Sequence, residues 1–279
     1  MQEFSTTLPT KSNEICSLTM VRRVAAMLDL DTASFSEGGL LPRGWHFFML
    51  AGETRKSSLR QDGFPGFGIP TPDLGLPRLL LGGRTVSYHN DIVIGSEIER
   101  TSFVKNISEK TGSSGPMAIV SIQHELRPVS KSSPAIIETQ TYILLSGKSV
   151  QTNIEKKPLV PILTKYQKKI VPDETLLFQY SALGFNSHKI HLDRDYAKNV
   201  EGLPDLVVNG GLATLLLTEL IRIELGLEVT DIKVKHTAPL FCGHTMTLTA
   251  EPGETNWQLK VFDNNNTVAV EMDANIKMI

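Results

Sequence analysis

Proton-exchanging side chains are concentrated in residues 186–195 of this 279-residue chain. Two of the seven histidines, His188 and His191, lie there with Asn186, Asp193 and Asp195. Because histidine is the side chain best able to exchange a proton near neutral pH, the run predicts a general base. An ordinary polar turn is the alternative that composition leaves open.

A second group of residues that could take part in catalysis follows at Asn209, Gly210 and Gly211, directly before a long apolar run. If that run is a helix, unpaired backbone N–H groups and the positive end of the helix dipole meet here, and glycine lets a ligand approach the backbone. Such a place suits a developing oxyanion. A plain helix cap at Asn209 is the alternative reading.

A metal site competes for the same residues, since His188, His191 and Asp193 offer nitrogen and oxygen ligands. Their spacing is a poor metal signature and no further ligand clusters beside them in the sequence. We therefore expect no metal and no cofactor.

The elements that must position these residues form a repeated pattern. In the second half, residues 212–225 are apolar on nearly every side, which predicts a buried helix. Strands are expected at 231–235, 244–250, 257–262 and 267–276. One buried helix followed by an antiparallel meander predicts an α+β arrangement in which the sheet wraps the helix.

The first half follows the same pattern of a helix, a loop and four strands. Apolar residues recur every three or four positions over residues 13–30, which predicts an amphipathic helix. A segment rich in glycine and proline follows at 36–84 and predicts a functional or mobile loop. Strands are expected at 85–88, 97–107, 117–126 and 136–145. The repeat predicts an internal pseudo-dimer with halves 1–150 and 174–279 and a linker at 151–173.

Composition excludes several classes of function. The 28 basic and 30 acidic residues give a formal charge of -2, so no whole-chain electrostatic argument supports a nucleic-acid partner. The two cysteines, Cys16 and Cys242, lie far apart and fit a reducing compartment. No signal-type N-terminus and no apolar stretch of 18 residues is visible. We expect a cytoplasmic protein that does not span a membrane.

Together these elements resemble the MaoC-like and (R)-specific enoyl-CoA hydratases. The most specific segment is 178–193 (FQYSALGFNSHKIHLD), followed by 201–208 (EGLPDLVV) and 238–241 (APLF). These match the subgroup of mesaconyl-C4-CoA hydratase, itaconyl-CoA hydratase and type 2 hydroxyacyl-thioester dehydratases. In the first half, 41–47 (LPRGWHF), 76–78, 82–84 and 112–116 are also similar to it. The resemblance implies a double hot-dog fold: two helices, each wrapped by an antiparallel sheet, with the second half catalytic.

The resemblance also implies roles for individual residues. His191 is the expected general base and acid, and the Gly210 amide is expected to stabilise the enolate. Asn186 stands where the wider family has Asp, so it orients water rather than carrying a proton. Asp193 is expected in a supporting or capping role. Tyr180, His188 and Asn209 are expected to contact substrate.

The implied enzyme is a hydro-lyase acting on an acyl-CoA, with coenzyme A as part of the substrate. The expected reaction hydrates itaconyl-CoA or mesaconyl-C4-CoA to citramalyl-CoA, with Arg84, Arg78 or Arg43 holding the free carboxylate. A fatty-acid 3-hydroxyacyl-thioester dehydratase and a silent acyl-CoA-binding protein remain alternatives. A thioesterase is disfavoured because no carboxylate lies in the first turn of the buried helix. A homodimer is possible.

Overall fold

The computed structural model describes residues 8–112, 115–146 and 161–277. The first half contributes β1 (Thr10–Ile15), α1 (Leu18–Met27), β2 (Arg78–Tyr88), β3 (Glu97–Gly112), β4 (Gly115–Pro128) and β5 (Ile136–Leu145). The second half contributes β6 (Tyr166–Ile170), α2 (Glu174–Leu183), α3 (Gly210–Glu219), β7 (Val229–His236), β8 (Met246–Pro252), β9 (Trp257–Phe262) and β10 (Val268–Ile276).

The strands form one antiparallel sheet whose order is the same in both halves, read outwards from its centre. The order is β1-β3-β4-β5-β2-β7-β10-β9-β8-β6 among the residues described. In each half the first strand lies at the edge, the second lies at the centre, and the remaining three run between them. The repeat expected from the sequence is therefore present, and the two halves meet where β2 pairs with β7.

The junction between the halves depends on a glycine. Gly83 pairs with Lys235, and a Cβ atom at Gly83 would lie 2.3 Å from the Val234 carbonyl oxygen. Only glycine allows the two backbones to come this close. The next residue, Arg84, is thereby fixed at the centre of the sheet.

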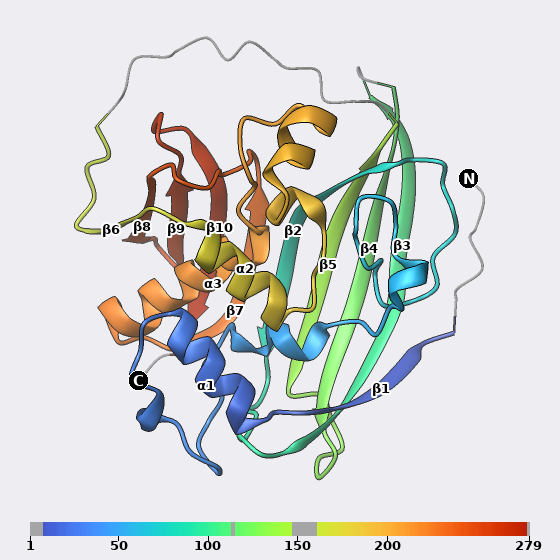
Figure 1. Ribbon diagram of the computed structural model, residues 1–279. Coiled ribbons are helices and arrows are strands. Elements are labelled where there is room, and N and C mark those ends of the chain that lie inside the picture. Colours follow the sequence, from blue (N-terminus) through green and yellow to red (C-terminus); the bar gives the residue numbers. More distant parts are fainter. Residues whose placement is uncertain (1–7, 113–114, 147–160, 278–279) are drawn as a thin grey trace.

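Helix α3 is the core of the second half. Every residue from Gly211 to Glu219 is buried, and the helix contacts β7, β8, β9 and β10. This is the expected outcome for a helix that is apolar on all sides. The helix predicted at 212–225 continues as a π-helical turn, Leu220–Leu225, which ends at Gly226 in the left-handed conformation. In Figure 1, α1, α2 and α3 lie together on one side of the curved sheet.

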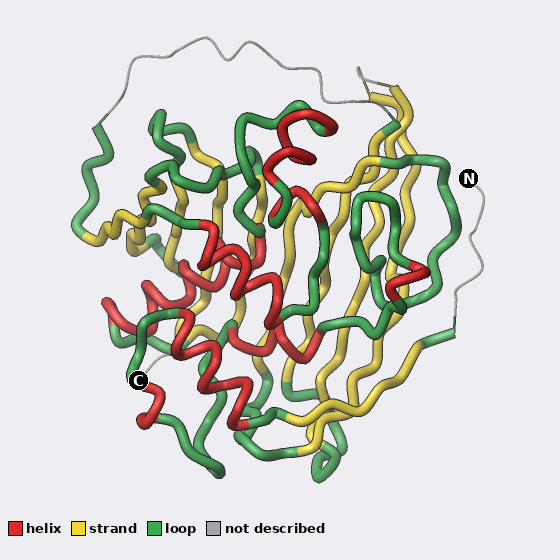
Figure 2. Tube along the Cα trace, in the orientation of Figure 1, coloured by secondary structure: helices red, strands yellow, loops and turns green. Residues whose placement is uncertain are grey.

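The first half departs from the expectation of a long central helix. Residues 10–15 form β1, so α1 is only ten residues long, and it packs against α2 rather than along its own sheet. The buried residues of α1 lie on one face, so packing against a single layer is enough to cover its apolar surface. The glycine- and proline-rich segment covers the sheet instead, through Phe67, Ile69, Leu74 and Leu76 packed on Ala118, Val120, Ile122 and Leu144. Figure 2 shows this long stretch of loop beside the strands.

The predicted linker at 151–173 is only partly a connection. Residues 147–160 lie outside the part of the chain that the structure describes. Within the remainder, Tyr166–Ile170 forms β6 and pairs with β8, so this part belongs to the sheet.

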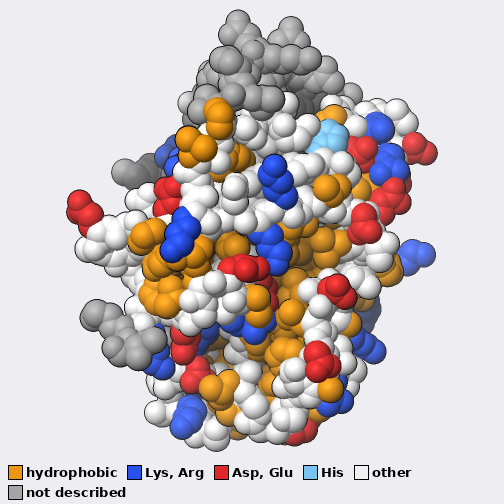
Figure 3. Space-filling model, turned by 90° about the vertical axis from the view of Figure 1, so that its left-hand side faces the viewer, with side chains coloured by type: hydrophobic (Ala, Val, Ile, Leu, Met, Phe, Trp, Pro, Cys, Tyr) orange, Lys and Arg blue, Asp and Glu red, His pale blue; other side chains and the backbone are white. Residues whose placement is uncertain are grey.

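Charged side chains of both signs are found on the surface, as the nearly neutral composition predicts. On the face seen in Figure 3, basic and acidic side chains are interspersed among hydrophobic ones. Among the residues described, no helix is both long enough and apolar enough to cross a membrane. Cys16 and Cys242 are buried free thiols.

Candidate active site

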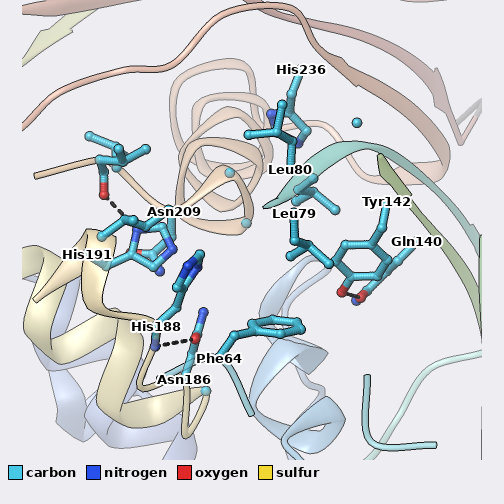
Figure 4. Close-up of a pocket in the computed structure, with 18 of the residues that line it drawn as sticks. Phe64, Leu79, Leu80, Gln140, Tyr142, Asn186, His188, His191, Asn209 and His236 are labelled. Carbon is cyan, nitrogen blue, oxygen red and sulfur yellow. Dashed lines mark hydrogen bonds between the residues drawn. The ribbon is translucent and has the colours of Figure 1, made fainter. Parts of the chain in front are cut away.

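A cavity of about 560 Å³ lies between the two halves (Figure 4). The glycine- and proline-rich segment and β2 form one wall, and the chain around α2, α3 and β7 forms the other. Histidine and amide side chains converge in it from the second half, and a buried arginine and aromatic rings come from the first. The polar residues lining it include Asp62, Arg78, Arg84, Gln140, Tyr142, Tyr180, Asn186, His188, His191, Asn209 and His236.

The end of α2 delivers Asn186 to this cavity. Phe185 adopts a left-handed conformation with φ of 47°, its N–H donates to the Ala182 carbonyl, and the Asn186 N–H donates to the Ser181 carbonyl. This pair of bonds is a Schellman cap, which reverses the chain at a helix end. The Asn186 Oδ1 accepts from the His188 N–H at 3.1 Å, so its amide nitrogen is the group left to bind substrate or water.

His191 is held in a single tautomer. Its Nδ1 lies 2.7 Å from the Val207 carbonyl oxygen, which can only accept, so Nδ1 carries the proton and Nε2 keeps the lone pair. Burial and the neighbouring His188 lower the pKa of His191 to about 3, despite the opposing effect of the bond to Val207. The imidazole is therefore neutral at pH 7, as a general base must be.

His188 stands edge-on to His191, with ring centroids 5.6 Å apart and an interplanar angle of 88°. Burial lowers the pKa of His188, while the carboxylate of Asp62 acts in the opposite direction. Figure 4 shows both rings and Asn186 on the same side of the cavity, with Phe64 opposite Asn186.

The first turn of α3 forms the next part of the wall. The Asn209 side chain exchanges hydrogen bonds with Ser181 and makes no capping bond to α3, so the simple N-cap alternative does not describe it. Gly210 and Gly211 line the cavity. A Cβ atom at Gly210 would lie 3.0 Å from Leu81, and one at Gly211 would lie 2.1 Å from the Tyr180 hydroxyl. These glycines keep the backbone N–H groups of the first turn accessible to a ligand oxygen.

Arg84 lies at the inner end of the cavity beside this turn. Its Nη1 lies 3.1 Å from Glu138, whose second oxygen lies 2.7 Å from His46 Nε2. Burial acts to lower the pKa of Arg84, but Glu138 together with Tyr180, Tyr142 and Tyr88 more than offsets it and the pKa is raised. Burial likewise acts to raise the pKa of Glu138, but Arg84 and His46 hold it well below its usual range. The pair is therefore charged, and the Arg84 Nε has no hydrogen-bond partner in the residues described.

Tyr180 stacks on Phe47 with ring centroids 4.6 Å apart and an interplanar angle of 18°. Burial raises the pKa of Tyr180, so its hydroxyl, which lies beside Gly211, keeps its proton.

The other residues singled out from the sequence are dispersed. Arg78 lines the cavity, with its Nε 3.9 Å from Glu201. Arg43 lies outside the cavity. Its guanidinium forms ion pairs with Asp91 and Glu228 and packs over the Tyr88 ring. Asp193 accepts from the Tyr196 N–H at 2.9 Å, which is a capping contact. The first turn of α3 contains no acidic residue.

Sequence reasoning missed four residues of this site: Asp62, His46, Glu138 and His236. Burial lowers the pKa of His236 to about 3, and its Nε2 is buried without a partner in the described residues. His46 lay in a segment already noted for its resemblance, and Asp62 precedes a glycine in a typical turn sequence. Only long-range packing brings Asp62 to the cavity and His46 to Glu138, the partner of Arg84.

No group of three or more His, Cys, Asp or Glu side chains in the described residues is arranged to hold a metal ion. His188 and His191 are neighbours, but the Asp193 carboxylate is engaged at the Tyr196 backbone instead of completing a ligand set.

Comparison with known proteins places this geometry in context. Residues 44–242 match the model of the family described as hydroxyacyl-thioester dehydratase type 2. The chain is 32% identical over 245 residues to mesaconyl-C(4)-CoA hydratase of Chloroflexus aurantiacus, covering 86% of this chain and 85% of that protein. It is 22% identical over 251 residues to the mitochondrial hydroxyacyl-thioester dehydratase type 2 of Saccharomyces cerevisiae, covering 84% and 86% respectively.

Solved structures confirm the fold. A MaoC-like dehydratase from Phytophthora capsici superposes with a TM-score of 0.69 at 13% identity, over 98% of this chain and 96% of that one. A conserved hypothetical protein of Mycobacterium tuberculosis, described as a double hot-dog fold, superposes with a TM-score of 0.61 at 14% identity, over 98% and 96%. The α+β double hot-dog fold expected from the sequence is confirmed. The chain belongs to the hydroxyacyl-thioester dehydratase type 2 family of MaoC-like hydro-lyases.

Proposed function

We propose that this protein adds water reversibly to the conjugated double bond of a short, branched acyl-CoA that carries a free carboxylate. Mesaconyl-C4-CoA, whose double bond is conjugated to the thioester, is the candidate substrate, and citramalyl-CoA is the product. Itaconyl-CoA, whose double bond lies one position further from the thioester, is a candidate that first loses an α-proton and gains one at its methylene carbon to become mesaconyl-C4-CoA. One observation carries the proposal: the lone-pair nitrogen of His191, the first turn of α3 and the buried guanidinium of Arg84 all border one cavity.

The chemistry follows from these groups. His191 Nε2 takes a proton from water as the oxygen bonds to the β-carbon, and the Asn186 amide nitrogen orients that water. Negative charge then moves to the thioester oxygen, to which the N–H groups of Gly210 and Gly211 donate hydrogen bonds. The α-carbon takes the proton back from the imidazolium, so the reaction needs no other reagent. Loss of one such oxyanion donor typically costs about 3 kcal/mol in the barrier.

Arg84 supports a carboxylated substrate. In mesaconyl-C4-CoA the free carboxylate is on the β-carbon, a few bonds from the thioester oxygen. The position that a Gly211 Cβ would occupy is 3.1 Å from Arg84 Nη2, so the guanidinium is adjacent to the turn that would hold that oxygen. A buried arginine is the side chain best suited to bind a carboxylate there. The 32% identity to a hydratase of mesaconyl-C(4)-CoA supports the same substrate class.

Dehydration of a 3-hydroxyacyl thioester in fatty-acid synthesis is the second candidate. Apolar side chains favour it, since Phe67, Leu79, Leu81 and Ile143 also line the cavity and suit an alkyl chain. The family description and the yeast relative support it as well.

A substrate panel separates the two candidates. Purified protein and its His191→Gln variant are mixed with mesaconyl-C4-CoA, itaconyl-CoA and crotonyl-CoA. Loss of enoyl-thioester absorbance is followed for mesaconyl-C4-CoA and crotonyl-CoA, and chromatography of the CoA ester product is used for itaconyl-CoA. A kcat/KM that is higher for the dicarboxylic thioesters than for crotonyl-CoA, with turnover abolished in the variant, is the expected result. Preference for crotonyl-CoA would establish the fatty-acid reaction instead. Absence of turnover on all three would refute the proposal and favour a silent acyl-CoA-binding protein.

A further inference from the structure

Asn186 leaves the catalytic loop without the carboxylate found there in the wider family, and the structure brings a carboxylate from the other half. The Asp62 Oδ2 lies 3.8 Å from His188 Nε2, and both side chains are largely buried, with exposed fractions of 13% and 8%. We propose that Asp62 is a positioning residue that acts through His188, orienting its ring and countering the positive charge that forms beside His191. This rests on the proposed hydration and adds the residue that replaces the missing carboxylate.

The contact is fixed by backbone pairing between the two segments. The Lys189 N–H donates to the Asp62 carbonyl at 2.8 Å, and the Ser187 hydroxyl donates to the Gly63 carbonyl at 2.7 Å. Gly63 has φ of 77°, and a Cβ there would lie 2.4 Å from the Ser187 carbonyl oxygen. The two segments therefore dock closely on either side of His188, and glycine is required at their contact.

The Asp62 side chain is itself held in place. Its Oδ1 accepts from the Phe64 N–H at 2.9 Å, closing a turn that sets the Phe64 ring 5.7 Å from the His188 ring. Its Oδ2 accepts from Arg60 Nη2 at 3.0 Å. A carboxylate with two such anchors presents its charge to His188 in one orientation.

The distance of 3.8 Å is too long for a hydrogen bond, so Asp62 acts on His188 through its charge. A carboxylate at this distance favours the His188 tautomer that carries its proton on Nε2. Its negative charge also stabilises the imidazolium that forms during the reaction. In hydration, the proton released by water is held on the His191 imidazole, next to the His188 ring, until the α-carbon takes it. The site then contains a buried positive charge that neither Asn186 nor the α3 turn can counter.

Other charged groups also act on His188. Glu201, like Asp62, raises the pKa of His188, whereas Arg60 lowers it, and His191 is the neighbouring base. Asp62 has the largest effect among these charges. Replacing it should therefore lower the pKa of His188 further.

The decisive variant is Asp62→Asn, because the amide oxygen can still accept from the Phe64 N–H while the charge is lost. Asp73→Asn is the matched control: Asp73 closes an equivalent turn in the same segment, with Oδ1 accepting from the Gly75 N–H at 2.9 Å, but it is exposed. Acid–base groups typically contribute about 10²–10⁴-fold, so a residue acting through one should lower kcat about tenfold or more with KM little changed. Asp73→Asn should leave both unchanged.

A double-mutant cycle excludes a merely structural role. In a His188→Gln background, Asp62→Asn should lower kcat no further, because its effect passes through the missing ring. Equal losses in both backgrounds, or no loss from Asp62→Asn in the parent, would overturn the inference. A loss of kcat matched by Asp73→Asn would do so too.

The inference also has a readout that needs no turnover. NMR titration of the His188 ring, assigned by its absence in His188→Gln, should give a lower pKa in Asp62→Asn than in the parent. An unchanged His188 pKa would overturn the role of Asp62 even in an active enzyme. If no thioester is turned over but the pKa falls, the coupling stands and the proposed reaction is the part that fails.

Discussion

Variants of the buried pair formed by Arg84 and Glu138 can separate an effect on protein stability from an effect on substrate choice. Glu138 is 1% exposed, and its charge is balanced by Arg84 and His46. Removing one member of a buried pair leaves an uncompensated charge and costs about 3–5 kcal/mol. Arg84→Met and Glu138→Gln should therefore each lower the free energy of unfolding by about that amount.

The double variant should behave differently, because replacing a whole buried pair by neutral groups is often close to neutral. We expect the Arg84→Met, Glu138→Gln protein to lie within about 1 kcal/mol of the parent in urea denaturation. It should nevertheless lack the guanidinium that binds the substrate carboxylate. A hydrogen bond to a charged group contributes about 1.5–3 kcal/mol, which corresponds to about 10- to 150-fold in kcat/KM.

The assay compares kcat/KM of this stable double variant on mesaconyl-C4-CoA and crotonyl-CoA. The loss should be confined to mesaconyl-C4-CoA. Arg78→Met is the matched control, since Arg78 lines the same cavity but is less buried, at 21% exposure. An equal loss on both substrates, or the same selective loss in Arg78→Met alone, would refute the assignment of the carboxylate to Arg84.

Three further predictions follow from the site. Gly210→Ala places a Cβ 3.0 Å from Leu81 and 3.1 Å from His236, which narrows the space at the first turn of α3 where the thioester oxygen would bind. It should lower kcat about 10²-fold, measured by steady-state kinetics on the folded variant. The pKa of His191 is lowered to about 3 from an unfolded value near 6.5, so protons bind the unfolded chain first as pH falls. The free energy of unfolding should then decrease between about pH 6.5 and 3, and His191→Gln should reduce that slope in urea denaturation at a series of pH values. Dialysis against EDTA should leave hydration unchanged; a loss restored by one divalent ion would contradict a metal-free reaction.

Local pattern was sufficient for most of the sheet. The strand predicted at 136–145 matches β5, and that at 257–262 matches β9. Alternating or continuous apolar residues bounded by turns define such strands within a few positions. Helix α3 was equally predictable, because a run that is apolar on every side can only be buried.

The first half was harder to predict because tertiary pairing overrides local periodicity there. Residues 13–15 fall within the helix predicted at 13–30, yet they belong to β1, which pairs with β3 as an edge strand. The glycine- and proline-rich segment has no period of its own, and only packing decides that it covers the sheet. The sequence therefore predicted a functional or mobile loop here, but it could not indicate that Asp62 and Phe64 reach the cavity.

The same contrast applies to the site. His191 and Gly210 lie within the motifs that identify them, so both could be singled out from the sequence, and both line the cavity. The partner that fixes the His191 tautomer is a backbone carbonyl, which no side-chain pattern reveals. Asp62 reaches His188 across more than a hundred residues, and Arg43 is used in a surface ion pair instead of the cavity.

The central claim is that His191, whose unprotonated Nε2 lies in the ring that lines the same cavity as the first turn of α3, is the acid–base group for hydration of a conjugated acyl-CoA. The most direct measurement is the rate of enoyl-thioester absorbance loss on mesaconyl-C4-CoA at pH 7 for the parent and for His191→Gln, with both shown to be folded. Turnover by the parent and a rate at least about 10²-fold lower in the variant are predicted. An active parent whose rate survives in His191→Gln would contradict the account.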